Sequence, residues 1–143
     1  MADLNLVDFY KDTALILVRL HSTFPRKIEL YVEDIIGPDD VDEFGLHSKR
    51  HEACLGAMFW LADEGYIRYY TNIRQEAIDQ VILTSKAVVL LGAIINDLPA
   101  PADINALPQT EALERMTLIE HIRTAIKEES SAQITQVMRR FFS

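Results

Sequence analysis

Cysteine and long apolar runs are scarce in this sequence of 143 residues. Its one cysteine, Cys54, cannot form an internal disulfide, and a zinc site built from several cysteines is excluded. The longest apolar runs, residues 14–18 and 87–95, are too short to span a bilayer. Asp3 and Asp8 lie where a secretory signal would carry Lys or Arg. We therefore expect a cytoplasmic protein with no membrane partner.

Basic residues are also few, with 14 Lys and Arg against 22 Asp and Glu and a net charge of −8. Residues 1–47 hold ten acids and four bases, whereas residues 48–98 and 99–143 each hold six acids and five bases. A DNA-binding surface must neutralise phosphates, and the overall charge works against this. The acidic N-terminal half is instead a possible surface for a protein partner. The 49% of hydrophobic residues is ordinary for one folded domain with a core.

Recognisable catalytic motifs are missing. The sequence has no Gly-rich phosphate loop, no nucleophile elbow and no His-Glu-x-x-His pattern, so we expect neither an enzyme nor a cofactor. His47 and His51 would share a face, as metal ligands must, if helix geometry reached back to His47, and Glu52 and Cys54 are close by. Cys54 fits the apolar face of the same helix equally well, because free cysteine is commonly buried. We therefore expect no metal site.

The first helix is predicted over residues 6–21 and is apolar on nearly every face around residues 14–18. A surface helix needs only one apolar stripe, so this helix should be buried on two sides, either by a later helix or by another subunit. A short strand at 27–32 and a helical stub at 33–36 should follow. Residues 37–46 form an acidic loop.

A second long helix should begin after the N-cap Ser48 and end at Gly65. Beyond it, apolar residues alternate with more polar ones, as in paired half-buried strands: Ile67, Tyr69, Val81 and Leu83. Residues 71–78 supply the turn, with Asn72 as the expected residue of positive φ. Thr84 or Ser85 should cap a helix that ends near residue 96.

The C-terminal part is set off by prolines. Residues 99–109 are a Pro-rich linker without periodicity, and residues 110–143 carry an apolar helical face, interrupted at Ser130 and Ser131. One or two helices bury too little apolar surface to fold alone. This segment must therefore pack on the first helix or cross to a partner. We favour a homodimer, because both segments carry more apolar surface than one contact uses.

Residues 6–96 resemble a winged helix-turn-helix domain of small bacterial DNA-binding transcriptional regulators. The resemblance is carried by the order of elements, by Glu64-Gly65-Tyr66 followed by Ile67, and by Leu83-Thr84-Ser85-Lys86. It implies a mainly α fold with a small β-hairpin wing, with residues 1–98 as the winged-helix domain and additional C-terminal helices. The loop before the long helix is longer and more acidic than usual in the family, and Ala87 stands where Gly is frequent.

The resemblance implies that the start of the long helix enters the major groove of duplex DNA while the wing touches phosphate. The candidate DNA-binding residues are Ser48, Lys49, Arg50, His51, Arg68, Asn72 and Arg74. If the chain is a DNA-binding regulator, Lys49→Glu with Arg50→Glu should abolish duplex binding without lowering thermal stability. The alternatives are that these two residues are ordinary solvated residues, that they pair with the acids at 39–43 just upstream, and that the domain binds a protein rather than DNA.

Overall fold

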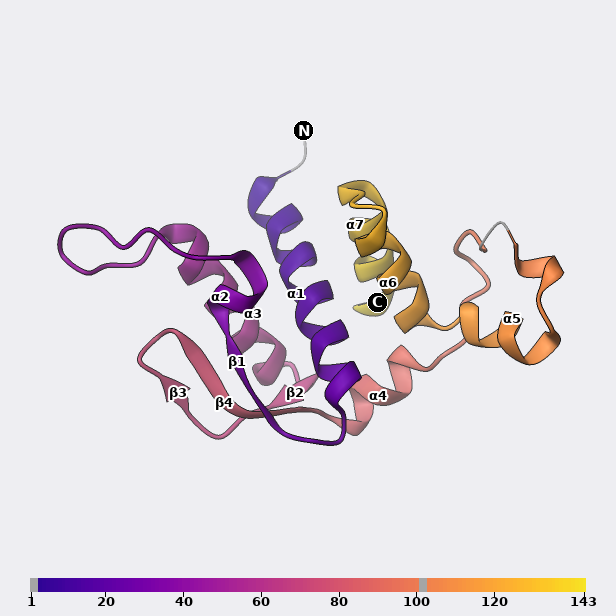
Figure 1. The fold of residues 1–143 in the computed structure, drawn as a ribbon, viewed down its shortest axis with the longest axis horizontal. Helices are drawn as coiled ribbons and strands as arrows, with labels where there is room; N and C mark the ends of the chain where they lie inside the picture. The colour runs from indigo at the N-terminus through magenta and orange to yellow at the C-terminus, as the bar shows by residue number, and fades with distance from the viewer. Residues whose placement is uncertain (1–2, 101–102) are drawn as a thin grey trace.

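The computed structural model describes residues 3–100 and 103–143, in which seven α-helices and a small antiparallel sheet form one α+β fold (Figure 1). The elements are α1 (Leu4–Thr23), β1 (Ile28–Tyr31), α2 (Val32–Ile36), α3 (Lys49–Asp63), β2 (Ile67–Arg68), β3 (Asn72–Ile73), β4 (Ala77–Leu83), α4 (Ser85–Leu91), a 3-10 turn (Ile104–Ala106), α5 (Gln109–Arg115), α6 (Leu118–Lys127) and α7 (Ser131–Phe141). None of the helices in the described ranges is both long enough and apolar enough to cross a membrane.

The central helix α1 is buried on two sides, as its sequence predicts. It contacts α3 on one side and α6 and α7 on the other, so that it lies between the N-terminal and C-terminal parts of the fold (Figure 1). Ile16 and Leu17 are fully buried. Of the two alternatives for the second side, the structure places helices of the same chain there.

The predicted pairing of the two alternating segments is confirmed. Ile67 of β2 lies opposite Leu83 of β4 in an antiparallel pair. The sheet is larger than a hairpin, because β4 also pairs with β1, at Ile28 opposite Val81, and with β3. The strand order is β1-β4-β2, and β4 is therefore the central strand.

An irregularity in β4 explains why β2 and β3 pair with different parts of it. Gln80 has a φ of 52°, in the left-handed region, and its N–H donates to the side chain of Asp79. The backbone of Asp79 meanwhile bonds that of Tyr70 and Thr71, between β2 and β3. This local arrangement divides β4 into two pairing segments.

The turn between β3 and β4 corrects one expectation. Asn72 does not have positive φ; Arg74 and Gln75 do, at 49° and 62°. The side chain of Asn72 instead accepts a hydrogen bond of 2.9 Å from the N–H of Gln75. An Asn side chain that closes the turn in this way leaves the left-handed positions to the two residues after Ile73.

The ends of α3 are confirmed as predicted, whereas α4 is shorter than expected. The hydroxyl of Ser48 accepts the N–H of His51, and Gly65 has a φ of 80° after the last turn of α3. α4 ends at Leu91 rather than near residue 96. The chain beyond it leaves the helix because Ile94 forms a β-bridge with Thr117, at the entry to α6.

The C-terminal helices share a single core with the rest of the chain. α6 and α7 pack against each other and against α1, and Ser130 caps α7 at the break that the sequence predicts. The apolar residues they bury are Leu118, Ile119, Ile122, Ala125, Ile134, Val137, Met138 and Phe141. Much of the apolar surface that favoured a dimer is thus covered within one chain, and dimerisation stays a prediction.

Candidate functional site

Two of the three regions that carry the predicted DNA-binding residues lie side by side, and the third is β2, which carries Arg68. The start of α3 meets the β3–β4 turn through His51, whose Nε2 lies 2.9 Å from the carbonyl oxygen of Gln75. At the same place the loop that follows α2 returns to α3, because Asp39 bonds Ser48. The site thus consists of the first turn of α3, the loop before it and the turn of the wing.

Four of the seven candidate residues are exposed and three are held inside the site. The exposed ones are Lys49, Arg68, Asn72 and Arg74. Ser48 and Arg50 are partly buried, and His51 is 4% exposed. A buried imidazole whose ring nitrogen already meets a backbone carbonyl is poorly placed to contact a base edge.

Arg50 is held by carboxylates of α1. Its Nη1 and Nη2 donate to the two oxygens of Asp12 at 2.7 and 2.5 Å, and its Nε lies 3.6 Å from Asp8. Asp12 is 1% exposed, so this is a bidentate ion pair with one fully buried partner. The hydrogen bonds to Asp12 raise the pKa of Arg50 above its ordinary value. Arg50 is therefore not a free cation, and its partner lies on α1 rather than in the upstream loop.

Asp39 anchors the acidic loop to the start of α3. One oxygen accepts the hydroxyl of Ser48 at 2.5 Å, and the other lies 3.1 Å from the backbone nitrogen of Ser48 and 2.9 Å from Nδ1 of His47. The hydrogen bond from the Ser48 hydroxyl, followed by those from its N–H and from His47, lowers the pKa of Asp39 to about 2. Asp39 is therefore ionised at neutral pH, and its carboxylate lies against the first turn of α3.

The rings of His47 and His51 stack against each other beside Asp39. Their centroids are 3.7 Å apart and their planes differ by 3°. Nδ1 of His51 lies 3.7 Å from Asp39 Oδ2 and has no hydrogen-bond partner within the described residues. Nε2 of His47 faces Glu76 at 4.0 Å. Sequence reasoning considered the two histidines together but missed Asp39 as the group that joins them.

Cys54, which the sequence placed near these histidines, belongs to the core instead. It is fully buried, and burial, reinforced by the nearby carboxylate of Asp12, raises the pKa of its thiol to about 12. It is not one of the side chains that surround Asp39 and the stacked rings.

We expect Cys54 to be unreactive in the folded protein. At pH 8 a thiol with a pKa near 12 is ionised in only about one molecule in ten thousand, and thiolate is the reactive form. Alkylation should therefore be at least about 100-fold slower in native protein than in urea-unfolded protein, where the pKa returns to about 8.5. Because the folded pKa is the higher one, stability should also fall as pH rises from about 9 to 12. Equal alkylation rates in both states would contradict the burial of this thiol.

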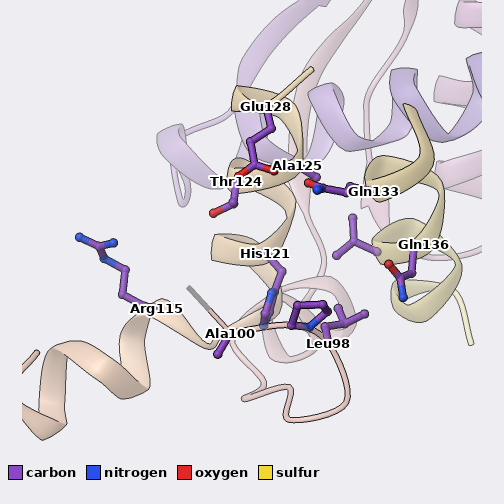
Figure 2. A pocket seen from close by; sticks show the side chains of 11 residues that line it. Leu98, Ala100, Arg115, His121, Thr124, Ala125, Glu128, Gln133 and Gln136 are labelled. Carbon is purple, nitrogen blue, oxygen red and sulfur yellow. The ribbon is translucent and has the colours of Figure 1, made fainter. Parts of the chain in front are cut away.

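A separate hollow lies at the other end of the fold, between the segment after α4 and helices α6 and α7 (Figure 2). Leu98 and His121 are among its lining residues, and the side chain of Arg115 extends away from them (Figure 2). Its remaining polar lining comes from Thr124, Glu128 and two glutamines, which do not converge on one point. The start of α3 is therefore the better candidate site.

Comparisons with known proteins add no identification: no protein-family model, curated protein or solved structure matches this chain.

Proposed function

We propose that this chain is a winged-helix protein-interaction module whose α2–α3 loop contacts the partner. The order α1-β1-α2-α3-β2-β3-β4, with β1 and β2 on either side of β4, supports the winged-helix interpretation. The carboxylates of Asp8, Asp12 and Asp39 lie at the place where a DNA-binding winged helix needs positive charge. Asp12 and Asp8 neutralise Arg50, and Asp39 adds a further negative charge, so the first turn of α3 offers a phosphate little net positive charge.

The α2–α3 loop is an organised structure that projects from the body of the fold (Figure 1). Asp42 closes it: one carboxylate oxygen accepts the N–H groups of Phe44 and Leu46 at 2.9 and 2.8 Å. The backbone of Asp42 pairs with that of Leu46, and Gly45 has a φ of 76°, which suits a residue without Cβ. The tip is therefore held in one turn although little else of the chain contacts it.

The single observation that carries the proposal is the apolar surface of this tip. Phe44 is 77% exposed and Leu46 is 62% exposed, and Val41 beside them is also exposed. Asp40, Asp42 and Glu43 surround them with negative charge. An aromatic anchor on a rigid turn with an acidic rim fits a protein partner that offers an apolar pocket bordered by Lys and Arg.

Duplex DNA is the second candidate partner, and exposed cations favour it. Lys49, Arg68 and Arg74 are exposed and form no ion pair within the described residues. They lie on α3, β2 and the β3–β4 turn, the elements that a DNA-binding winged helix uses. A transcriptional regulator of this type would make its phosphate contacts through them.

The two candidates are separated by two matched variants. Phe44→Ser with Leu46→Ser should abolish capture of a partner and leave the fold intact, whereas Val89→Ser, on the exposed side of α4, should leave capture unchanged. The readout is the set of proteins cross-linked to wild type and to the Val89 variant but lost with the loop variant. Binding of wild type to duplex DNA at low salt, with affinity that falls steeply with salt and is lost in Lys49→Glu with Arg74→Glu, would contradict the proposal.

A further inference from the structure

We propose that Asp39, His47 and His51 bind one divalent first-row transition metal ion, for which Zn²⁺ is the expected occupant. This inference runs against the expectation from the sequence and does not depend on the proposed function. Each of the three residues offers one ligand atom, and these atoms all lie within 4.8 Å of one another. Two imidazoles and one carboxylate are a ligand set that Zn²⁺ and Fe²⁺ use in proteins.

The hydrogen bonds of His51 determine where its lone pair points. Nε2 lies 2.9 Å from the carbonyl oxygen of Gln75, which can only accept, so Nε2 carries the hydrogen. In the neutral ring Nδ1 is then an acceptor, and it is buried without a donor. What it faces is Oδ2 of Asp39, which is also an acceptor. Nδ1 of His51 is thus a buried acceptor without a donor, and a cation between it and the carboxylate of Asp39 would satisfy it.

The spacing suits a metal ion better than a proton. A hydrogen bond does not form across the 3.7 Å that separates His51 Nδ1 from Asp39 Oδ2. Two ligands bound tetrahedrally to zinc at about 2.0–2.1 Å are separated by about 3.4 Å. The distance from His47 Nδ1 to the same oxygen is 2.9 Å, which is shorter than this separation. Shifts of about half an ångström or less bring these two distances to the spacing of a zinc site, and the stacked rings must also tilt so that both Nδ1 lone pairs point at the ion.

The groups behind the three ligands also match a metal site. Ligating histidines usually donate their second N–H to a carbonyl or carboxylate, and the ring of His51 does so to Gln75 while that of His47 faces Glu76 at 4.0 Å. Ser48 donates its hydroxyl to the second oxygen of Asp39 and fixes the orientation of that carboxylate. A bound ion would tie the α2–α3 loop to the first turn of α3.

The test is titration of the metal-free full chain with Zn²⁺ and, as a spectroscopic probe, Co²⁺. We expect one ion per chain and a rise in Tm of roughly 5–10 °C at a metal concentration about 100 times the dissociation constant. His47→Gln and Asp39→Asn should each weaken binding by more than the 10–100-fold typical of losing a supporting residue. The matched control is His21→Gln, which changes a half-buried histidine paired with Arg123 on another part of the fold.

Three outcomes would overturn the assignment. The first is that wild type binds neither Zn²⁺ nor Co²⁺ at up to about 100 micromolar. The second is that His21→Gln reduces affinity as much as His47→Gln. The third is that the Co²⁺ spectrum is identical in wild type and Asp39→Asn. Because Asp39→Asn also loses charge beside Ser48, circular dichroism of each variant without metal establishes that it is folded. His47, which is partly exposed, provides the variant least prone to unfold.

Discussion

Replacing Arg50 with alanine should destabilise the protein by about 3 kcal/mol, although Arg50 lies on a helix surface. The substitution leaves the carboxylate of Asp12, which is 1% exposed, without its bidentate partner. An uncompensated buried charge is one of the few changes that cost this much. Lys49→Ala, one residue earlier and exposed, is the matched control and should change stability by no more than about 0.5 kcal/mol. Urea unfolding measures both variants.

A double replacement distinguishes a buried charge from lost packing. Asp12→Ala with Arg50→Ala removes both charges, and it should be more stable than Arg50→Ala alone, because no unpaired carboxylate remains in the core. A double variant less stable than the single one by the full cost of Asp12→Ala would show that the two side chains act independently. An Arg50→Ala protein as stable as wild type would contradict the ion pair itself.

The same ion pair changes how DNA binding can be tested. From the sequence we expected that reversing the charges of Lys49 and Arg50 together would not lower thermal stability. With Arg50 bound to Asp12, Arg50→Glu places a second acid against a buried one, and loss of DNA binding in such a variant would report unfolding. Lys49, Arg68 and Arg74 are the exposed residues at which charge reversal tests DNA contact without this complication.

Local signals in the sequence were sufficient to predict the ends of α3 and the pairing of β2 with β4. The Ser48 cap, the positive φ of Gly65 and the alternation that places Ile67 opposite Leu83 are each determined by a few neighbouring residues. The same is true of the break before α7 at Ser130. These features require no knowledge of what lies elsewhere in the chain.

The features that sequence reasoning missed depend on residues far apart in the chain. Asp12 and Arg50 are 38 positions apart, and only the packing of α1 on α3 brings them together. The one available signal was a carboxylate at position 12, at the edge of an apolar stretch of helix, where an acid requires a partner. Asp39 likewise was one of several acids in its loop, and nothing local indicated that it would bond Ser48.

The sequence predicted that α1 is buried on two sides, but only the structure could decide whether a later helix or a second subunit covers the second side. An apolar helix face is equally well covered by a later helix or by a second subunit, because the hydrophobic effect does not distinguish them. In the described residues α6 and α7 cover the second side of α1. If Ile122 belonged to a dimer interface, it would be exposed in a single chain, but it is fully buried. Ile122→Asp should therefore unfold the protein rather than convert a dimer into a folded monomer.

Replacing Phe141 with alanine should destabilise the whole protein by about 3–5 kcal/mol, although it lies two residues from the end of the sequence. Phe141 is 1% exposed and packs edge-on against Phe142 and beside Tyr66, with ring centroids 5.1 and 5.2 Å apart. Tyr66 follows α3, so this aromatic cluster joins α7 to the N-terminal part of the core.

Leu113→Ala, on the exposed helix α5, is the matched control and should cost less than about 1 kcal/mol. Thermal unfolding followed by circular dichroism should show a single transition for Phe141→Ala, at a lower Tm than in wild type. An early loss of α7 signal with the rest of the fold unchanged would mean that the C-terminal helices are a separate unit, as expected of a dimerisation segment.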